Sequence, residues 1–159
     1  YDEHVAKGID TLLQRTDILG DRACAVSHTR GGYMTLRALV KHQKQDQVAC
    51  YVSYYPHWQD PNAAEAKQIY QYAPELNDLN VPTLVFIGEH DQYQRIRPIM
   101  AGIDTLKENN VDAELIIYPG IGRGFDFRPA HVRTFADDLA TKDANQRTAA
   151  FIRQHLMQR

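Results

Sequence analysis

A hydroxyl residue stands at a sharp turn of this sequence, between a short apolar strand and a helix. Residues 23–26 form an apolar run, the segment 27–32 (S-H-T-R-G-G) follows, and an apolar-periodic stretch begins after it. A strand, a tight turn and a helix in this order can hold a nucleophilic side chain at the tip of the turn. Thr29 occupies that tip, so attack by its hydroxyl is one reading. The other, which we favour, is that Thr29 only caps the amides of the following helix.

Three further residues are candidates for contacting a substrate. Arg30 follows Thr29 and could meet an anionic substrate, although an exposed arginine at a helix start is the ordinary arrangement. His57 and Trp58 follow the second apolar strand, where a pocket would be lined, but loop histidines and core aromatic residues are commoner. No group of His, Cys and Asp has the spacing of metal ligands, so we expect neither a metal nor a cofactor.

The hydrophobic pattern alternates between helix and strand along the whole chain. Helices are expected at 2–15, 31–44, 95–109 and roughly 131–157, and strands at 23–27, 48–55, 83–88 and 113–118. Residues 57–80 are the least regular part, with partial helix expected from 61 to 72. Strands separated by helices of this length indicate a parallel sheet. The expected fold is therefore a three-layer α/β/α arrangement in one domain, residues 1–159.

The composition excludes several classes of partner. The net charge is −2, from 18 basic and 20 acidic residues, so neither nucleic acid nor an anionic membrane is an expected partner. No apolar run approaches the roughly 20 residues that span a bilayer. Cys24 and Cys50 both lie in expected strands. We favour free thiols that fill space in a reducing, cytoplasmic setting, and a disulfide between neighbouring strands is the alternative.

The first expected strand raises a question about the edge of the sheet. Residues 23–27 are small, apolar and uncharged, which suits the centre of a sheet and not an exposed edge. Further strands should therefore pair with it, and this chain does not encode them. Because the sequence starts at Tyr1 without a methionine, we expect a preceding segment. That segment or a partner chain would complete the sheet.

Four sequence blocks resemble the dienelactone hydrolase family of α/β-hydrolases. Residues 28–34 (H-T-R-G-G-Y-M) resemble the family's G-H-S-R-G-G-Y-M elbow, and residues 81–91 (V-P-T-L-V-F-I-G-E-H-D) its strand leading to the catalytic aspartate. Residues 118–125 (Y-P-G-I-G-R-G-F) resemble its Y-P-G-A-x-H-G-F, where the histidine is the base, and residues 143–151 its terminal helix. The blocks lie in the family's order and cover nearly the whole chain. The resemblance implies an α/β-hydrolase fold whose N-terminal strands and oxyanion-hole loop lie outside this chain.

The resemblance also implies roles for three residues. Asp91 matches the family's acid, Thr29 its nucleophile and Arg123 its base. A guanidinium stays protonated and cannot accept a proton, so Arg123 cannot act as the base. Facing Asp91, it is expected to form a salt bridge with two hydrogen bonds. For every histidine a surface or loop position is the commoner reading, and His131 and His28 rank first among the histidines that could replace the base.

Two classes of function follow. The first is an ester or lactone hydrolase in which Asp91 orients a base and Thr29 attacks. The second is a homologue with lost or strongly reduced serine-type activity, kept as a binding or assembly subunit, in which Arg123 and Asp91 are paired. A hydrolase requires a histidine nitrogen within about 3 Å of the Thr29 hydroxyl, or bridged to it by one water. We favour the second class because Arg123 lacks the chemistry of a base.

Overall fold

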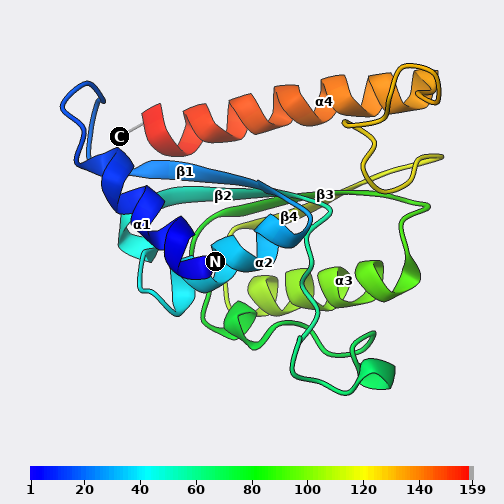
Figure 1. Cartoon of the computed structure of the whole chain (residues 1–159), viewed down its shortest axis with the longest axis horizontal. Coiled ribbons are helices and arrows are strands. Elements are labelled where there is room, and N and C mark those ends of the chain that lie inside the picture. The colour runs from blue at the N-terminus through cyan, green and yellow to red at the C-terminus, as the bar shows by residue number, and fades with distance from the viewer. Residues whose placement is uncertain (158–159) are drawn as a thin grey trace.

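A single parallel sheet organises the chain. The computed structural model describes residues 1–157 and contains four strands in the order β1-β2-β3-β4, all parallel to their neighbours (Figure 1). The strands are β1 Ala23–His28, β2 Val48–Tyr54, β3 Thr83–Gly88 and β4 Ala113–Tyr118. The bounds of β3 and β4 are those predicted from the sequence, because both are short apolar runs with clear ends.

Helices cover both faces of the sheet, as the pattern predicted. They are α1 Asp2–Leu13, α2 Arg30–Val40, α3 Tyr93–Glu108 and α4 Phe135–Ile152. In Figure 1, α4 lies alone over one face, while α2 and α3 lie on the other and α1 packs along α2. All residues of β2 and β3 are buried between these layers. The core therefore sits around the two central strands, and their carboxyl ends are fixed in place.

β1 forms one edge of the sheet. Within residues 1–157, β2 is the one strand that pairs with it. Val26 in the middle of β1 is 46% exposed, which is unusual for an apolar residue of a strand that suits a sheet centre.

Two predicted helix boundaries were wrong. The last helix begins after Thr134 and not at residue 131, because the Thr134 hydroxyl accepts a hydrogen bond from the Asp137 amide and the Asp137 carboxylate accepts one from the Thr134 amide. The second helix ends at Val40 and not at residue 44, and Gln43 just after it has a left-handed backbone with φ of 56°.

The segment 57–80 is less helical than predicted. It contains short 3₁₀ turns at Glu65–Lys67 and Pro74–Asn77 and no α-helix. At its start the Asp60 carboxylate accepts a hydrogen bond from the Asn62 amide, a local turn that competes with helix formation.

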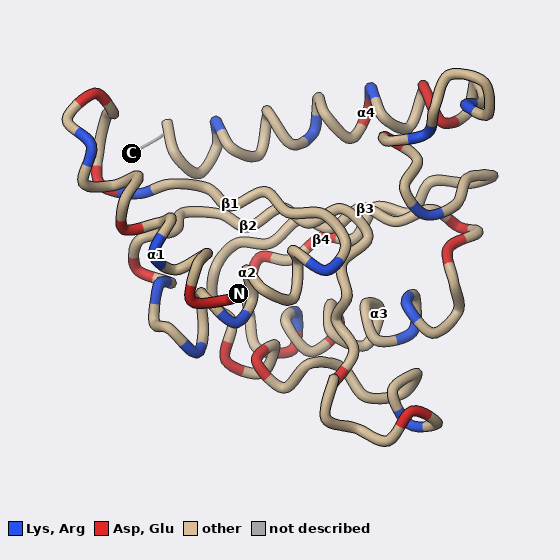
Figure 2. Tube along the Cα trace, in the orientation of Figure 1, with Lys and Arg blue, Asp and Glu red and all other residues tan. Residues whose placement is uncertain are grey.

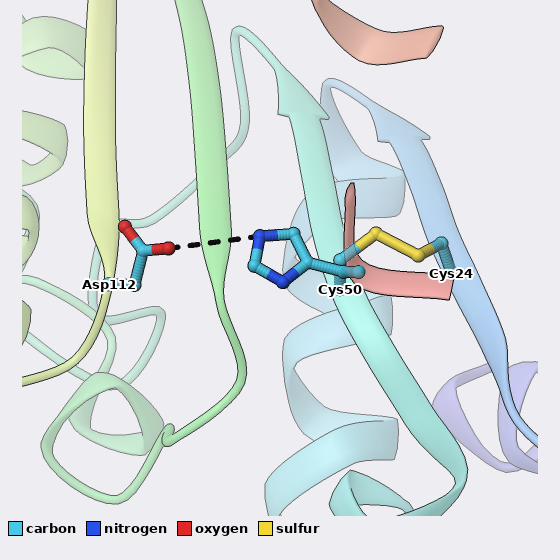
Figure 3. Close-up of a disulfide and its surroundings, with 4 residues drawn as sticks. Cys24, Cys50 and Asp112 are labelled. Atoms are coloured by element: carbon cyan, nitrogen blue, oxygen red, sulfur yellow. Dashed lines mark ion pairs between the residues drawn. A yellow bond between two sulfur atoms is a disulfide. The ribbon is translucent and has the colours of Figure 1, made fainter. Parts of the chain in front are cut away.

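A disulfide joins Cys24 of β1 to Cys50 of β2 (Figure 3). The two residues are directly opposite each other in the strand register, with their Cα atoms 4.7 Å apart. The favoured expectation of two free thiols was therefore wrong. The register of adjacent strands, which the sequence does not specify, decides this pairing.

Charged residues of both signs are interspersed along the helices and loops (Figure 2). Across residues 1–157, we find no helix with the length and apolar character needed to cross a membrane.

Candidate active site

The turn between β1 and α2 has the geometry of a nucleophile elbow. Thr29 has φ of 48° and ψ of −118°, a backbone conformation that a β-branched residue adopts only with strain. The first turn of α2 packs very closely on the end of β2 at Gly32. A Cβ atom there would lie 2.5 Å from Pro56 Cβ and 2.7 Å from Ser53 Oγ. The absence of a side chain at Gly32 therefore allows the elbow to form.

The Thr29 hydroxyl caps the helix, as we favoured from the sequence. Its Oγ1 accepts a hydrogen bond from the Arg30 amide. In an elbow of this type, the amide after the nucleophile contributes to the oxyanion hole. In this chain the amide in question, that of Arg30, already donates to the Thr29 hydroxyl.

His57 is the histidine that approaches the elbow. Its backbone amide donates to the Thr29 carbonyl oxygen at 3.0 Å, and its Nε2 lies 3.5 Å from Thr29 Oγ1. Burial, together with the charges of Arg95, Arg123 and Arg30, lowers the pKa of His57 to about 4. The ring is therefore neutral near pH 7 and is a weak base. Among the described residues, Thr29 is the one side chain in hydrogen-bond range of this ring.

Asp91 and Arg123 are paired. Arg123 Nη1 donates to Asp91 Oδ2 at 3.1 Å, and the Asp91 side chain is fully buried. The predicted pairing is present, but the predicted second hydrogen bond is not. The other oxygen of Asp91 accepts a hydrogen bond from the Gln92 amide, and Arg123 Nη2 is buried with no partner within residues 1–157.

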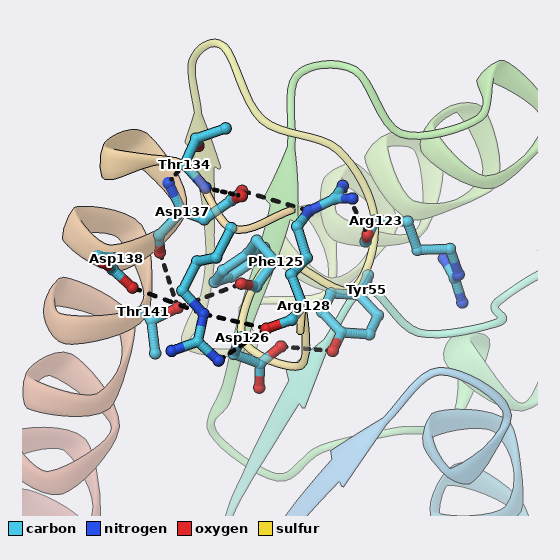
Figure 4. Close-up of polar contacts among 10 residues, drawn as sticks. Tyr55, Arg123, Phe125, Asp126, Arg128, Thr134, Asp137, Asp138 and Thr141 are labelled. Carbon is cyan, nitrogen blue, oxygen red and sulfur yellow. Dashed lines mark hydrogen bonds and ion pairs between the residues drawn. The ribbon is translucent and has the colours of Figure 1, made fainter. Parts of the chain in front are cut away.

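The loop that carries Arg123 is held by contacts on two sides (Figure 4). Arg128 donates to the Arg123 carbonyl oxygen at 3.2 Å and forms an ion pair with the buried carboxylate of Asp137 at 3.4 Å. On the other side, the Arg123 guanidinium lies over the Tyr55 ring, 5.2 Å from its centroid. Tyr55 itself has a left-handed backbone with φ of 39° and donates its hydroxyl to Asp126. Arg123 is therefore anchored in the loop.

The histidines favoured as substitutes for the base lie elsewhere. His28 Nε2 is 3.0 Å from Asp126 Oδ2, and its ring stacks on Tyr54 in an apolar pocket beneath α4. His131 is exposed on the loop before α4. Neither histidine substitutes for the base, because strand direction turns His28 away from Thr29. His131 is the exposed loop residue that its ordinary reading predicts.

The residues expected to contact substrate are divided between site and core. Arg30 is exposed at the start of α2, beside Thr29. His57 lies at the elbow, as described above. Trp58 is completely buried and sits close to Gly102 of α3, so the expectation that it lines a pocket was wrong. Alternation along the chain after β2 turns one of these two neighbours outward and the other inward.

Arg95 is a site residue that the sequence reasoning missed. It lies in the first turn of α3, where Arg95 Nη1 donates to Gln59 Oε1 at 2.7 Å. Burial, and then the nearby charge of Arg123, lower its pKa. The sequence signal for Arg95 is that it follows Asp91 by four residues. An arginine on the surface of the helix would be equally compatible with that position. No group of three or more potential metal ligands occurs within residues 1–157.

Comparisons with known proteins identify the family of this chain. The model of the dienelactone hydrolase family matches residues 4–156, almost the whole chain. The chain belongs to the dienelactone hydrolase family. No match was found among curated proteins.

Solved structures show the same fold at low identity. A presumed dienelactone hydrolase from Klebsiella pneumoniae subsp. pneumoniae MGH 78578 is 21% identical, with a TM-score of 0.72 over 96% of this chain and 62% of that one. Thermogutta terrifontis esterase 2, phosphoramylated by tabun, is 15% identical, with a TM-score of 0.67 over 94% of this chain and 64% of that one. EstE1, a thermostable carboxylesterase from a metagenomic library, is 18% identical, with a TM-score of 0.63 over 91% and 62%. The chain thus spans less than two thirds of each.

In this member of the dienelactone hydrolase family, Asp91, which matches the family's acid, and the elbow both lie at the carboxyl ends of the parallel strands. Ligands bind at these strand ends in open α/β sheets. The fold therefore brings the site residues together, and the chemistry of Thr29 and Arg123 decides what the site can do.

Proposed function

We propose that this chain is a dienelactone-hydrolase-like protein whose serine-type hydrolase activity is lost or strongly reduced. The contact between Arg123 and Asp91 carries the proposal. A guanidinium cannot take the proton of an attacking hydroxyl. It also engages the carboxylate that would orient a base in a catalytic triad.

The elbow supports the same conclusion independently. A tetrahedral intermediate needs amide donors aimed at its oxyanion, and losing one donor costs about 10²- to 10³-fold in rate. The Arg30 amide is engaged by the Thr29 hydroxyl, so attack by that hydroxyl would have to begin by breaking this hydrogen bond. In the resting site, the hydroxyl that would attack and the amide that would stabilise the oxyanion are therefore hydrogen-bonded to each other.

Restoring the missing groups tests this proposal. The double variant Thr29→Ser/Arg123→His should hydrolyse p-nitrophenyl acetate at least about tenfold faster than the parent chain, because it regains a nucleophile and a base. The matched control is Thr29→Ser/Arg123→Gln, which removes the cation without supplying a base and should stay at background. Equal rates for both double variants would show that these two positions are not what limits hydrolysis.

A second candidate is slow hydrolysis of a small ester or lactone by Thr29 with His57 as a non-standard base. The 3.5 Å separation of Thr29 Oγ1 and His57 Nε2 favours it, since a modest movement would make a hydrogen bond. This candidate predicts a rate that falls to background in Thr29→Ala and in His57→Gln. Its pH profile should rise as the pH passes about 4, the pKa of His57.

A third candidate is a non-catalytic assembly role, in which a preceding segment or a partner chain adds a strand to β1. The exposed apolar Val26 on this edge favours it. A charge on an edge strand opposes such pairing, so Val26→Lys should block the association in analytical ultracentrifugation. Ile117→Lys is the matched control, since Ile117 is 44% exposed on β4 at the opposite edge. Equal behaviour of the two variants would exclude β1 as the docking edge.

A further inference from the structure

The pocket beneath α4 is a concave site on the face of the sheet opposite to α2 (Figure 1). Its volume is about 440 Å³, which is in the range of small-molecule sites. Strands β1 and β2, the loop after β4 and the second half of α4 contribute its lining, which consists of Val26, His28, Tyr54, Asp126, Phe127, Asn145, Thr148, Ala149 and Ile152. Thr29, Asp91 and Arg123 do not line it, so this pocket is separate from the elbow.

Most of the lining is apolar or already hydrogen-bonded. Val26 of β1 and Ala149 of α4 supply aliphatic surface. The Tyr54 hydroxyl donates to Asn145 Oδ1 at 3.0 Å and lies 2.8 Å from Thr148 Oγ1, so this buried hydroxyl is paired. An uncharged apolar body would therefore fit against this surface without leaving the tyrosine hydroxyl unpaired.

Asp126 is the one carboxylate that lines the pocket within the described chain. Its Oδ2 accepts a hydrogen bond from His28 Nε2 at 3.0 Å, and its Oδ1 accepts one from the Tyr55 hydroxyl (Figure 4). Burial would raise the pKa of Asp126, but the hydrogen bonds from His28 and Tyr55 outweigh burial and lower the pKa. The group is therefore ionised near pH 7. A carboxylate offers about four acceptor positions, so these two contacts leave positions for a further donor.

No permanent cation of the protein offsets this carboxylate in the pocket. Among the residues that the structure describes, no Lys or Arg lines the pocket, and His28 is charged only when protonated. Arg128, two residues after Asp126, pairs instead with Asp137 at 3.4 Å. Phe127 adjoins Asp126 and is 66% exposed, so an aromatic ring is available beside the carboxylate. Both a carboxylate and the face of an aromatic ring attract a cation.

We propose that this pocket binds a small organic amine in its ammonium form. The ammonium group donates to Asp126 and lies against the Phe127 ring, while the apolar body of the amine lies along Val26 and Ala149. A cation fits better than an anion or a neutral molecule, because the charge of the lining is negative when His28 is neutral. This binding uses no residue of the elbow, so it goes beyond the proposed loss of hydrolysis and does not depend on it.

Three probes of equal length separate the effect of charge from that of apolar contact. n-Hexylammonium, 1-hexanol and hexanoate are titrated at about pH 7.5, where an alkyl amine is protonated, and the backbone amide shifts of the protein are followed by NMR. Hexylammonium should bind at a single site and shift the amides of Phe127 and Ala149. 1-Hexanol should bind about tenfold more weakly because it lacks the charge, and hexanoate should not saturate.

Two substitutions test the named contacts. Asp126→Asn keeps the shape of the side chain and removes its charge, so the affinity for hexylammonium should fall about tenfold, to that for 1-hexanol. Asp143→Asn is the matched control, because Asp143 also accepts a tyrosine hydroxyl, that of Tyr118, but does not line the pocket. Phe127→Leu removes the ring and should weaken the binding of hexylammonium about 2- to 5-fold without changing the affinity for 1-hexanol.

Filling the pocket gives a test that leaves the contacts of Asp126 in place. Ala149→Leu puts a larger side chain into the pocket and should weaken the binding of both hexylammonium and 1-hexanol, whereas Ala150→Leu, at the exposed neighbouring position, should weaken neither. No saturable shift with hexylammonium up to about 10 mM, or equal affinity in the parent chain and Asp126→Asn, would overturn the proposal. Shifts that change on dilution of the parent chain but not with hexylammonium would also overturn it and would assign the pocket to a second copy of the chain.

Discussion

Thr29 holds a conformation at the tip of the elbow that its own side chain disfavours. A left-handed φ of 48° on a β-branched residue costs roughly 1–3 kcal/mol, and the cap to the Arg30 amide returns part of this. Backbone strain of this kind is common where a turn positions a functional side chain. In this chain the strained turn is present, although the Thr29 hydroxyl at its tip is hydrogen-bonded to the first amide of α2.

Thr29→Gly should therefore stabilise the protein by about 1 kcal/mol, because glycine adopts this backbone freely and a glycine cap costs only a few tenths. Urea unfolding measures the change. Thr11→Gly is the matched control, an exposed threonine inside α1, and should lower the free energy of unfolding by about 0.3 kcal/mol. A loss of stability in both variants would contradict the strain at the elbow.

His57 should make the stability of the protein depend on pH. Its pKa is about 4 in the folded chain, below the ordinary value of 6.5, so between these values the unfolded chain binds more protons. The stabilisation is complete above pH 6.5 and is lost as the pH falls through 4. We expect about 1–2 kcal/mol after allowance for solvent screening. The His57→Gln variant should show a shallower acid loss of the free energy of unfolding, and an unchanged slope would contradict this role.

At the scale of elements, close backbone packing sets where the loop with Arg123 can lie. The end of β3 touches this loop at Gly88. A Cβ atom there would be 2.5 Å from the Ile121 carbonyl oxygen and 2.7 Å from that of Gly122. Backbone atoms cannot rotate away as a side chain can, so the position of the loop depends on the missing side chain.

Gly88→Ala should push the loop from β3, destabilise the chain by about 1–3 kcal/mol and separate Arg123 from Asp91. Thermal unfolding measures the first effect and a crystal structure of the variant the second. Gly8→Ala is the matched control, since nothing lies within 4 Å of its added Cβ on α1. It should stabilise by about 0.5–1 kcal/mol. A neutral Gly88→Ala would contradict the tight contact.

The sequence predicted the elements better than the contacts between them. Short, mostly apolar runs bounded by polar or turn residues placed β3 and β4 correctly. The approach of His57 to Thr29 depends instead on the left-handed Tyr55 and on a backbone hydrogen bond to the Thr29 carbonyl oxygen. Neither leaves a sequence signal. Arg95 was missed because its spacing from Asp91 does not separate a site residue from a surface one.

At the scale of the molecule, a disulfide links the edge strand of the sheet to its neighbour. The disulfide joins β1, which has one pairing strand within residues 1–157, to β2 in the core. The helices on one face and α4 on the other cover the central strands (Figure 1). The covalent link therefore fixes the edge strand β1 to the buried strand β2.

Reducing this disulfide should lower the free energy of unfolding by about 3.5 kcal/mol, the chain-entropy value for a sequence separation of 26 residues. The variant Cys24→Ala/Cys50→Ala should show the same loss and should not respond to reductant. The free energy of unfolding from urea titration, with and without reductant, measures both. A parent chain that does not respond to reductant would contradict a stabilising disulfide.

The central claim is that the Arg123–Asp91 pair and the self-capped Thr29 leave the elbow without serine-type hydrolysis. The rate of p-nitrophenyl acetate hydrolysis by the parent chain, compared with Thr29→Ala, tests it most directly. We predict equal rates at the background of the assay across pH 5–9, a range near the usual working pH of hydrolases. A parent rate more than about tenfold above Thr29→Ala, or about 1.4 kcal/mol of transition-state stabilisation, would contradict the claim.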